Sequence, residues 1–177
     1  MIRTVAVLFI FTLVLSANAQ TPTSTYTNLG EKFCRTLKSS DAEGGEYVGR
    51  CPGIAGFTLL VTEGDLRQNV TVVTPKGAKH SLELWSVVSS AFSSLGPKAE
   101  WRVKRVKNKT TPTALIVRYN ASENPDKPEQ TTSYLAVIKI TTTEICVTDK
   151  VSPGARANEE ARKLADESAT KPCLKAQ

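Results

Sequence analysis

The chain has 177 residues, with 23 lysines and arginines against 17 acidic residues and a net charge of +6. This length favours a single domain. The charge is too modest for a nucleic-acid-binding protein, which excludes that class, but it is compatible with an anionic partner.

The first nineteen residues have the three parts of a secretory signal peptide. A short positive start is followed by the apolar run Val5–Leu15 and by an Ala-x-Ala cleavage site at 17–19. The apolar run is shorter than the about 20 residues that span a membrane, and no later run reaches that length. We therefore predict cleavage after Ala19. The mature protein would be secreted or periplasmic, have no membrane span and carry a charge of +5, because only Arg3 is lost.

All four cysteines lie beyond the signal peptide, at Cys34, Cys51, Cys146 and Cys173. An even number of cysteines in an exported chain is typical of a disulfide framework. Four cysteines allow three pairings, and we favour Cys34–Cys51 with Cys146–Cys173 because the members of each pair are close in sequence. The closely spaced cysteine pairs of zinc sites are missing, so we predict no metal, and no motif indicates a cofactor.

The first half of the mature chain is predicted to contain a leader, a hairpin and a helix. Residues 20–27 are polar and threonine-rich, which indicates a flexible leader before one domain of residues 28–177. Residues 28–37 are weakly favoured as a helix. Strands at Phe57–Thr62 and Leu66–Thr74 flank a glycine turn and predict a β-hairpin.

A helix is predicted at Ser81–Leu95, because apolar residues recur there at helical spacing. Gly96-Pro97 would end this helix, since glycine suits a left-handed cap and proline cannot continue a helix. The following strands are predicted at Trp101–Val106, Thr113–Tyr119, Ser133–Thr141 and Glu144–Thr148, and a C-terminal helix at Ala157–Ala169. The predicted fold class is α+β, an antiparallel sheet of about six strands with the mid-chain and C-terminal helices packed on it.

Several fragments of the chain carry a family resemblance. They are Cys51-Pro52-Gly53, Glu63-Gly64-Asp65-Leu66-Arg67, Glu100-Trp101-Arg102 and the run from Ala157-Asn158-Glu159 to Asp166 ahead of Cys173. Together they resemble a family of small secreted or periplasmic bacterial proteins of unassigned function. The resemblance supports the disulfide pairing and implies no activity.

The sequence contains no complete catalytic set, so no catalytic residue is predicted. Its single histidine, His80, is expected to be a partly exposed loop residue, and no serine lies in a nucleophile elbow. Cysteines that form disulfides supply no thiolate. Isolated carboxylates at Glu63, Asp65 and Glu100 could serve a hydrolase, which needs only two of them, although Glu63-Gly64-Asp65 is most simply a turn.

The densest charge feature is a basic ribbon at 98–109, opposed only by Glu100. Its candidate binding residues are Trp101, Arg102, Lys104, Arg105 and Lys107. A bulge at Lys104–Arg105 would return Val106 to the core. The alternative interpretation is a solvated strand face, with Trp101 and Trp85 as core residues.

These observations predict an exported, non-enzymatic binding domain. Its partner would be an envelope protein or an anionic envelope polymer. The alternative is a small extracytoplasmic hydrolase that uses isolated carboxylates near Trp101. The hydrolase requires Glu63, Asp65, Glu100 and His80 to converge in one cavity.

Overall fold

The computed structural model describes residues 21–40 and 45–176, and the predicted signal peptide lies outside the described residues. In this part of the chain, ten strands form one mixed sheet. The strands are β1 Thr23–Asn28, β2 Arg35–Ser39, β3 Tyr47–Pro52, β4 Thr58–Gly64, β5 Arg67–Val73, β6 Lys79–Ser81, β7 Phe92–Val106, β8 Lys109–Ser122, β9 Thr132–Ile140 and β10 Ile145–Val151. The helices are α1 Leu84–Val87 and α2 Ala157–Asp166, with 3-10 turns at Glu31–Phe33 and Ser168–Thr170.

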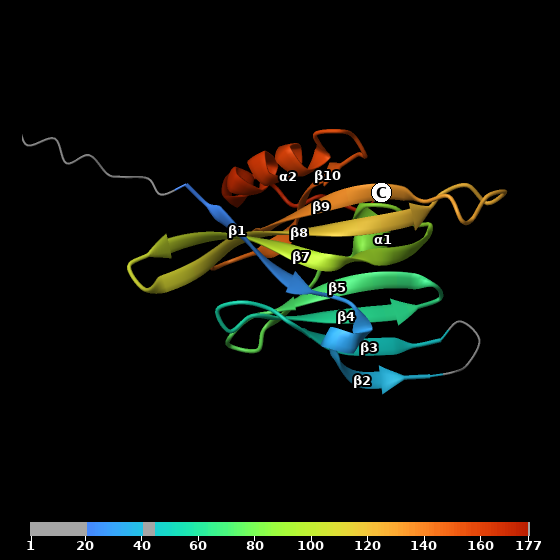
Figure 1. Ribbon diagram of the computed structural model, residues 1–177, viewed down its shortest axis with the longest axis horizontal. Coiled ribbons are helices and arrows are strands. Elements are labelled where there is room, and N and C mark those ends of the chain that lie inside the picture. The colour runs from blue at the N-terminus through green and yellow to red at the C-terminus, as the bar shows by residue number, and fades with distance from the viewer. Residues whose placement is uncertain (1–20, 41–44, 177) are drawn as a thin grey trace, which may run out of the picture.

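The strands follow the order β10-β9-β8-β7-β5-β4-β3-β2 (Figure 1). β1 adds to β7 and β6 adds to β5, and the described pairings are antiparallel except for one parallel contact between Ser93 of β7 and Arg67 of β5. The predicted α+β fold with about six antiparallel strands is therefore wrong. The protein is mostly β and its sheet is mixed, because segments predicted to be a leader and helices are strands.

The predicted helix Ser81–Leu95 is the largest local error. Only the single turn of α1 is helical, and the chain is extended again in the 15-residue strand β7. Gly96-Pro97 lies inside β7, at an irregularity in its pairing with β8, and ends no helix. A Cβ on Gly96 would lie 2.7 Å from Cβ of Arg118, so this position requires glycine where two strands approach closely.

The start of the described chain is also extended. Most of the predicted leader 20–27 belongs to β1, which pairs with residues 98–103 of β7. Residues 28–37, weakly favoured as a helix, contain the first 3-10 turn and the start of β2. Threonine and tyrosine in β1 suit a strand, but its pairing with β7 is a long-range contact that local periodicity does not report.

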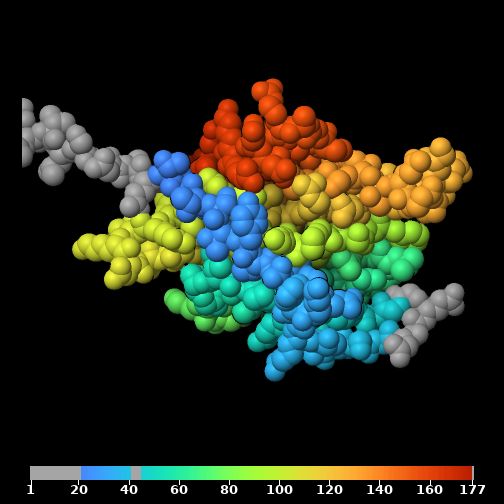
Figure 2. Space-filling view, viewed as in Figure 1, coloured from blue at the N-terminus to red at the C-terminus, as the bar shows by residue number. Residues whose placement is uncertain are grey.

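The sheet bends around the main core, and α2 covers its outer face. Apolar side chains of β4 and β5, such as Leu59 and Val70, share one buried cluster with Trp101 of β7 and with residues of β8 and β9. The opposite face of β8 and β9 packs on Ala161 and Ala165 of α2. Figure 2 shows β1, in blue, crossing the molecule beside α2, in red. Strands that are buried on both faces have continuous apolar runs in their sequences, and β8 and β9 contain such runs.

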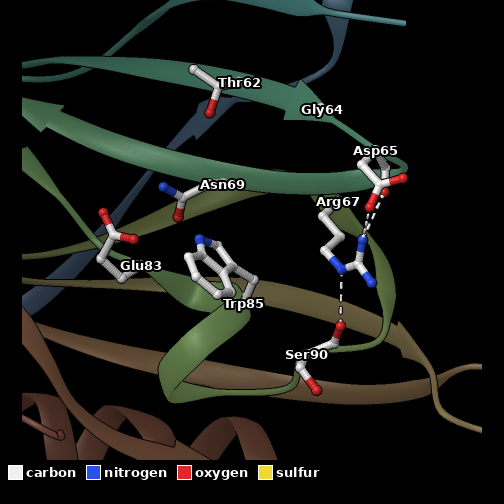
Figure 3. A pocket seen from close by; sticks show the side chains of 8 residues that line it. All are labelled: Thr62, Gly64, Asp65, Arg67, Asn69, Glu83, Trp85 and Ser90. Carbon is white, nitrogen blue, oxygen red and sulfur yellow. Dashed lines mark hydrogen bonds and ion pairs between the residues drawn. The ribbon is translucent and has the colours of Figure 1, made fainter. Parts of the chain in front are cut away.

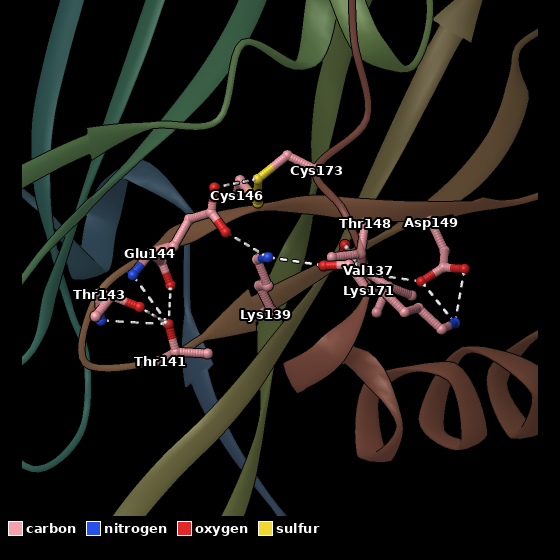
Figure 4. Close-up of a disulfide and its surroundings, with 10 residues drawn as sticks. All are labelled: Val137, Lys139, Thr141, Thr143, Glu144, Cys146, Thr148, Asp149, Lys171 and Cys173. Atoms are coloured by element: carbon pink, nitrogen blue, oxygen red, sulfur yellow. Dashed lines mark hydrogen bonds and ion pairs between the residues drawn. A yellow bond between two sulfur atoms is a disulfide. The ribbon is translucent and has the colours of Figure 1, made fainter.

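Both predicted disulfides are confirmed, Cys34–Cys51 and Cys146–Cys173. The second ties β10 to the segment after α2 (Figure 4). The predicted C-terminal helix is confirmed as α2, which begins at Ala157 and ends at Asp166. Among the described residues, no helix is both long and apolar enough to span a membrane.

Candidate functional site

A basic tip ends the hairpin of β7 and β8. We use this name for Lys104, Arg105, Lys107 and Lys109, all of which are exposed. Val106 pairs with Lys109 across a two-residue turn, in which Lys107 has a φ of +53°. Figure 1 shows this hairpin projecting from one end of the molecule, at the left, well beyond the helices. Three predicted binding residues therefore lie together on an accessible surface.

The register of the hairpin distributes these cations over both of its faces. Side chains alternate along a strand, and directly paired residues point to the same side. Lys109 lies opposite Val106, so it shares a face with Val106 and Lys104. Arg105 is on the other face. The tip is thus surrounded by positive charge.

The other two predicted binding residues, Trp101 and Arg102, are buried. Trp101 is 0% exposed and donates its indole N–H to Oγ1 of Thr27 at 2.9 Å. Arg102 is 7% exposed, and its Nε and Nη2 each donate to a carboxylate oxygen of Asp166 at 2.8 Å. A bidentate pair of this kind satisfies a buried guanidinium. Neither side chain is accessible to an external ligand, so Trp101 and Arg102 do not belong to the candidate binding surface.

The bulge predicted at Lys104–Arg105 lies elsewhere. The register shifts between Arg102 and Val103, where Thr113 of β8 is the extra residue. Its Oγ1 donates to the carbonyl oxygen of Arg102 at 3.2 Å. Val106 does not return to the core, and is instead 63% exposed. The two strands leave the body of the protein here and continue as an exposed ribbon.

Carboxylates neutralise the cations under α2 but not those of the basic tip. None of the four tip residues forms an ion pair within the described part of the chain. Glu100, the one acidic residue of this ribbon, instead accepts from Nε of Arg162 on α2 at 2.6 Å. The positive charge of the tip is therefore uncompensated, which favours the approach of anions.

Glu100 is held ionised in a structural network. Burial raises the pKa of its carboxyl, but hydrogen bonds from Arg162 and Ser24 outweigh burial and hold the pKa below its ordinary value. The same contact raises the pKa of the Arg162 guanidinium. A general acid must carry a proton near its working pH, so this environment is unsuited to acid catalysis by Glu100.

The candidate residues of the hydrolase do not converge. Glu63 and Asp65 hydrogen-bond within the β4–β5 hairpin, to Gln68 and Arg67. His80 lies on β6, opposite the far part of β5, and Glu100 lies under α2. None of the four main cavities among the described residues is lined by two of these candidates. The structure gives the hydrolase alternative no common site.

Glu144 and the two cysteines of the Cys146–Cys173 disulfide form a group of metal-capable side chains. Their ligand atoms lie within 4.8 Å of one another. The sulfurs are bonded to each other, whereas a cysteine binds metal as a free thiolate. Glu144 also forms an ion pair with Nζ of Lys139 at 2.5 Å (Figure 4). The group therefore belongs to the structural surroundings of the disulfide.

The largest of the four main cavities among the described residues is a groove that the sequence-based predictions did not include. Its volume is about 550 Å³, and it lies open between the β4–β5 hairpin and α1 (Figure 3). Its lining residues are Thr62, Gly64, Asp65, Arg67, Asn69, Glu83, Trp85 and Ser90. Trp85, predicted as a core residue, is 47% exposed. Leu82 and Leu84 are buried while Glu83 and Trp85 are exposed, and this alternation is the signal that could have placed Trp85 outside.

Comparisons of the chain with protein families, curated proteins and solved structures found no match. The resemblance to small secreted bacterial proteins therefore stays a prediction. The functional proposals rest on the residues of this chain alone.

Proposed function

We propose that this protein is an exported, non-enzymatic binding domain that holds an anionic polymer of the cell envelope through its basic tip. One observation carries the proposal: four cations gather on a projecting hairpin without an acidic partner among the described residues. Unpaired cations attract a polyanion, and binding releases the counterions of the polymer.

The distribution of charge supports a polymer over a flat surface. Lys104 and Lys109 lie on one face of the ribbon and Arg105 on the other. A flexible chain can contact both faces, whereas a flat lipid surface meets one face at a time. Val106 is the single large apolar side chain exposed at the tip, which is too little for the apolar anchoring that interfacial segments use.

The base of the hairpin supports the proposal by its rigidity. Trp101 is fixed in the core and Arg102 is clamped to α2 by Asp166. A ligand-binding element that is already ordered loses less entropy on binding. The tip is therefore a projecting but well-anchored element.

The two disulfides support an extracytoplasmic location. Disulfides persist in oxidising compartments and are rare in the cytosol. Together with the predicted signal peptide, they favour a secreted or periplasmic protein, where envelope polymers are accessible.

Salt-gradient elution from immobilised heparin tests the proposal. The test variant replaces Lys104, Arg105, Lys107 and Lys109 with serine, and the control replaces the exposed Lys76, Lys79, Lys127 and Arg156 with serine. Both lose three lysines and one arginine, so their net charges are equal. We expect the test variant to bind about 10–100-fold more weakly at low salt and with a smaller salt dependence, while the control stays close to the wild type. If both variants lost heparin affinity equally, net charge alone would explain the binding, and the proposal would be overturned.

A further inference from the structure

We infer that the groove beside Trp85 is a saccharide-binding site that takes a neutral sugar unit. The groove is lined by residues of the β4–β5 hairpin and the α1 segment, and these elements lie toward the other end of the molecule from the turn of the β7–β8 hairpin (Figure 1). The inference therefore stands on different residues from the proposed polymer contact.

The backbone around α1 fixes the outward direction of two groove residues. Leu82 and Leu84 are buried at 3% and 0% exposure. The amide N–H of Leu82 donates to the carbonyl oxygen of Val70 at 2.9 Å, and that of Leu84 donates to Oδ1 of Asn69 at 3.1 Å. Because these contacts hold the chain on both sides of Glu83, the side chains of Glu83 and Trp85 are directed away from the core.

The far wall of the groove is also held in place. Nδ2 of Asn69 donates to Oγ of Ser81 at 2.9 Å, and Nε of Arg67 donates to the carbonyl oxygen of Ser90 at 2.9 Å. Arg67 also pairs with Asp65 (Figure 3). The groove is thus pre-organised by contacts of its lining residues with one another and with Ser81.

Three polar groups on the groove remain without a partner within the described part of the chain. They are the indole N–H of Trp85, the carboxylate of Glu83 and the hydroxyl of Thr62. Figure 3 shows the indole of Trp85 between Glu83 and Arg67, with its nitrogen toward the β5 side. They offer a donor, an acceptor and a group that can act as either.

Glu83 adopts a backbone conformation that a glutamate rarely takes. Its φ is +48° and its ψ is +42°, in the left-handed region. Only glycine visits this region freely, and strained residues of this kind cluster at binding sites. A glutamate kept in this conformation at the groove is accounted for if its carboxylate has a role there.

A sugar ring matches this set of groups. It has an apolar C–H face that can lie on the exposed indole, and a rim of hydroxyls that can donate to Glu83, accept from Trp85 Nε1 and exchange with Thr62. The groove volume of about 550 Å³ is in the range of about 300–1,000 Å³ for small-ligand sites. Seven of its eight lining residues are polar, charged or glycine and the eighth is Trp85, so a ligand with both a polar rim and an apolar face suits the groove.

The charges around the groove favour a neutral ligand over a cationic peptide. Asp65 and Arg67 neutralise each other, which leaves one carboxylate, that of Glu83. This one carboxylate can accept a hydrogen bond from a sugar hydroxyl, whereas a lysine peptide brings several cations and meets no second unpaired carboxylate among the lining residues. We therefore expect a neutral oligosaccharide to bind better than a lysine peptide.

Tryptophan fluorescence provides a first test, because the chain has two tryptophans and Trp101 is fully buried. The probes are chitotetraose, cellotetraose and maltotetraose, with trilysine as the competing class. We expect at least one oligosaccharide to produce a saturable change in Trp85 emission and trilysine to produce none. No response to any oligosaccharide, or a saturable response to trilysine that Glu83→Gln removes, would overturn the inference.

Calorimetric titration of variants with the responding oligosaccharide provides the second test. Trp85→Ala should abolish binding, and Glu83→Gln should weaken it about 10-fold, as expected for losing a charged hydrogen bond. Phe33→Ala is the matched control, because Phe33 is an aromatic residue of similar exposure, 52%, outside the groove. Binding that survives Trp85→Ala would place the sugar elsewhere and contradict the inference.

Glu83→Gly separates a binding role from a structural one. Glycine relaxes the left-handed conformation, so the melting temperature should be unchanged or higher. Saccharide binding should still fall, because the carboxylate is gone. The basic-tip variant should bind the neutral sugar as the wild type does, so failure of this inference is distinguishable from failure of the polymer proposal.

Discussion

Two arginines three residues apart on β7 lie in opposite environments. Arg102 is buried and neutralised by Asp166 of α2, whereas Arg105 is exposed and forms no ion pair among the described residues. Both belong to one strand and both are paired with β8. What differs is coverage, because β1 pairs beside the first position and α2 contacts its side chain, whereas β1 does not extend to the second position and no ion pair joins it to α2. The function of a charged residue on a strand therefore depends on the elements that pack against it. The covered Arg102 stabilises the fold, whereas the uncovered Arg105 is accessible to a ligand.

The largest expected effect is on the covered side of this comparison. Arg102→Met should lower the free energy of unfolding by about 3 kcal/mol, because removing one member of a buried ion pair leaves the other uncompensated. Asp166 would lose both hydrogen bonds, and Ser24 Oγ and the carbonyl oxygen of Pro22 would each lose a donor. Urea denaturation measures the loss. A change below about 1 kcal/mol, within the range of ordinary surface substitutions, would contradict a stabilising role for the buried Arg102.

An intermediate effect is expected at Glu100, which links the same network to Arg162. Glu100→Gln should cost about 2 kcal/mol at neutral pH, since hydrogen bonds to charged groups are lost. The folded pKa of Glu100 lies below its ordinary value of 4.5. Its contribution to stability is therefore complete above that ordinary value and is lost as the pH falls through the folded pKa.

Urea denaturation between neutral and acidic pH tests the titration of Glu100. The stability of the wild type should fall more steeply below about pH 4.5 than that of Glu100→Gln. Parallel curves would mean that another carboxyl dominates the acid response.

The smallest effect is expected on the uncovered side. Arg105→Met should change the free energy of unfolding by less than about 0.5 kcal/mol, as surface substitutions away from special contacts usually do. The same variant should elute earlier from heparin than the wild type. If Arg105→Met were as destabilising as Arg102→Met, the tip would be a structural element after all.

Local chemistry in the sequence accounts for the parts of the fold that were predicted. The disulfide pairing followed from the closeness of the paired cysteines in the sequence, and α2 lies within the helix predicted at residues 157–169. The β4–β5 hairpin followed from alternation around a glycine turn. In each case the sequence signal that predicted the feature lies within a short stretch of the chain.

Errors arose where distant contacts override local spacing. Leu84 and Val88 are buried at the single turn of α1, but the helical series continues into Leu95, which belongs to β7. Gly96-Pro97 has the composition of a helix stop, yet it accommodates the close approach of Arg118. β1 was missed because its partner strand is far away in the sequence.

The candidate sites also divide into features that local sequence signals predicted and features that depend on distant contacts. Lys104, Arg105 and Lys107 were predicted as exposed cations from the charge run alone. Burial of Arg102 requires Asp166, which is 64 residues away, so sequence spacing could not separate it from the others. The groove at Trp85 joins β4, β5 and α1, and only the alternation at 82–85 pointed to it.

Ser24 joins the beginning of the described chain to its middle, because its hydroxyl bridges Glu100 and Arg102, 76 and 78 residues away. Arg162 and Asp166, which complete this network, follow Ser24 in the chain by 138 and 142 residues. During synthesis, Ser24 precedes α2, so its network can close only after α2 has been made. Contacts between such distant segments form slowly, so the anchored base of the basic ribbon is a late product of folding. That ribbon therefore gains its rigid support only after α2 has been synthesised.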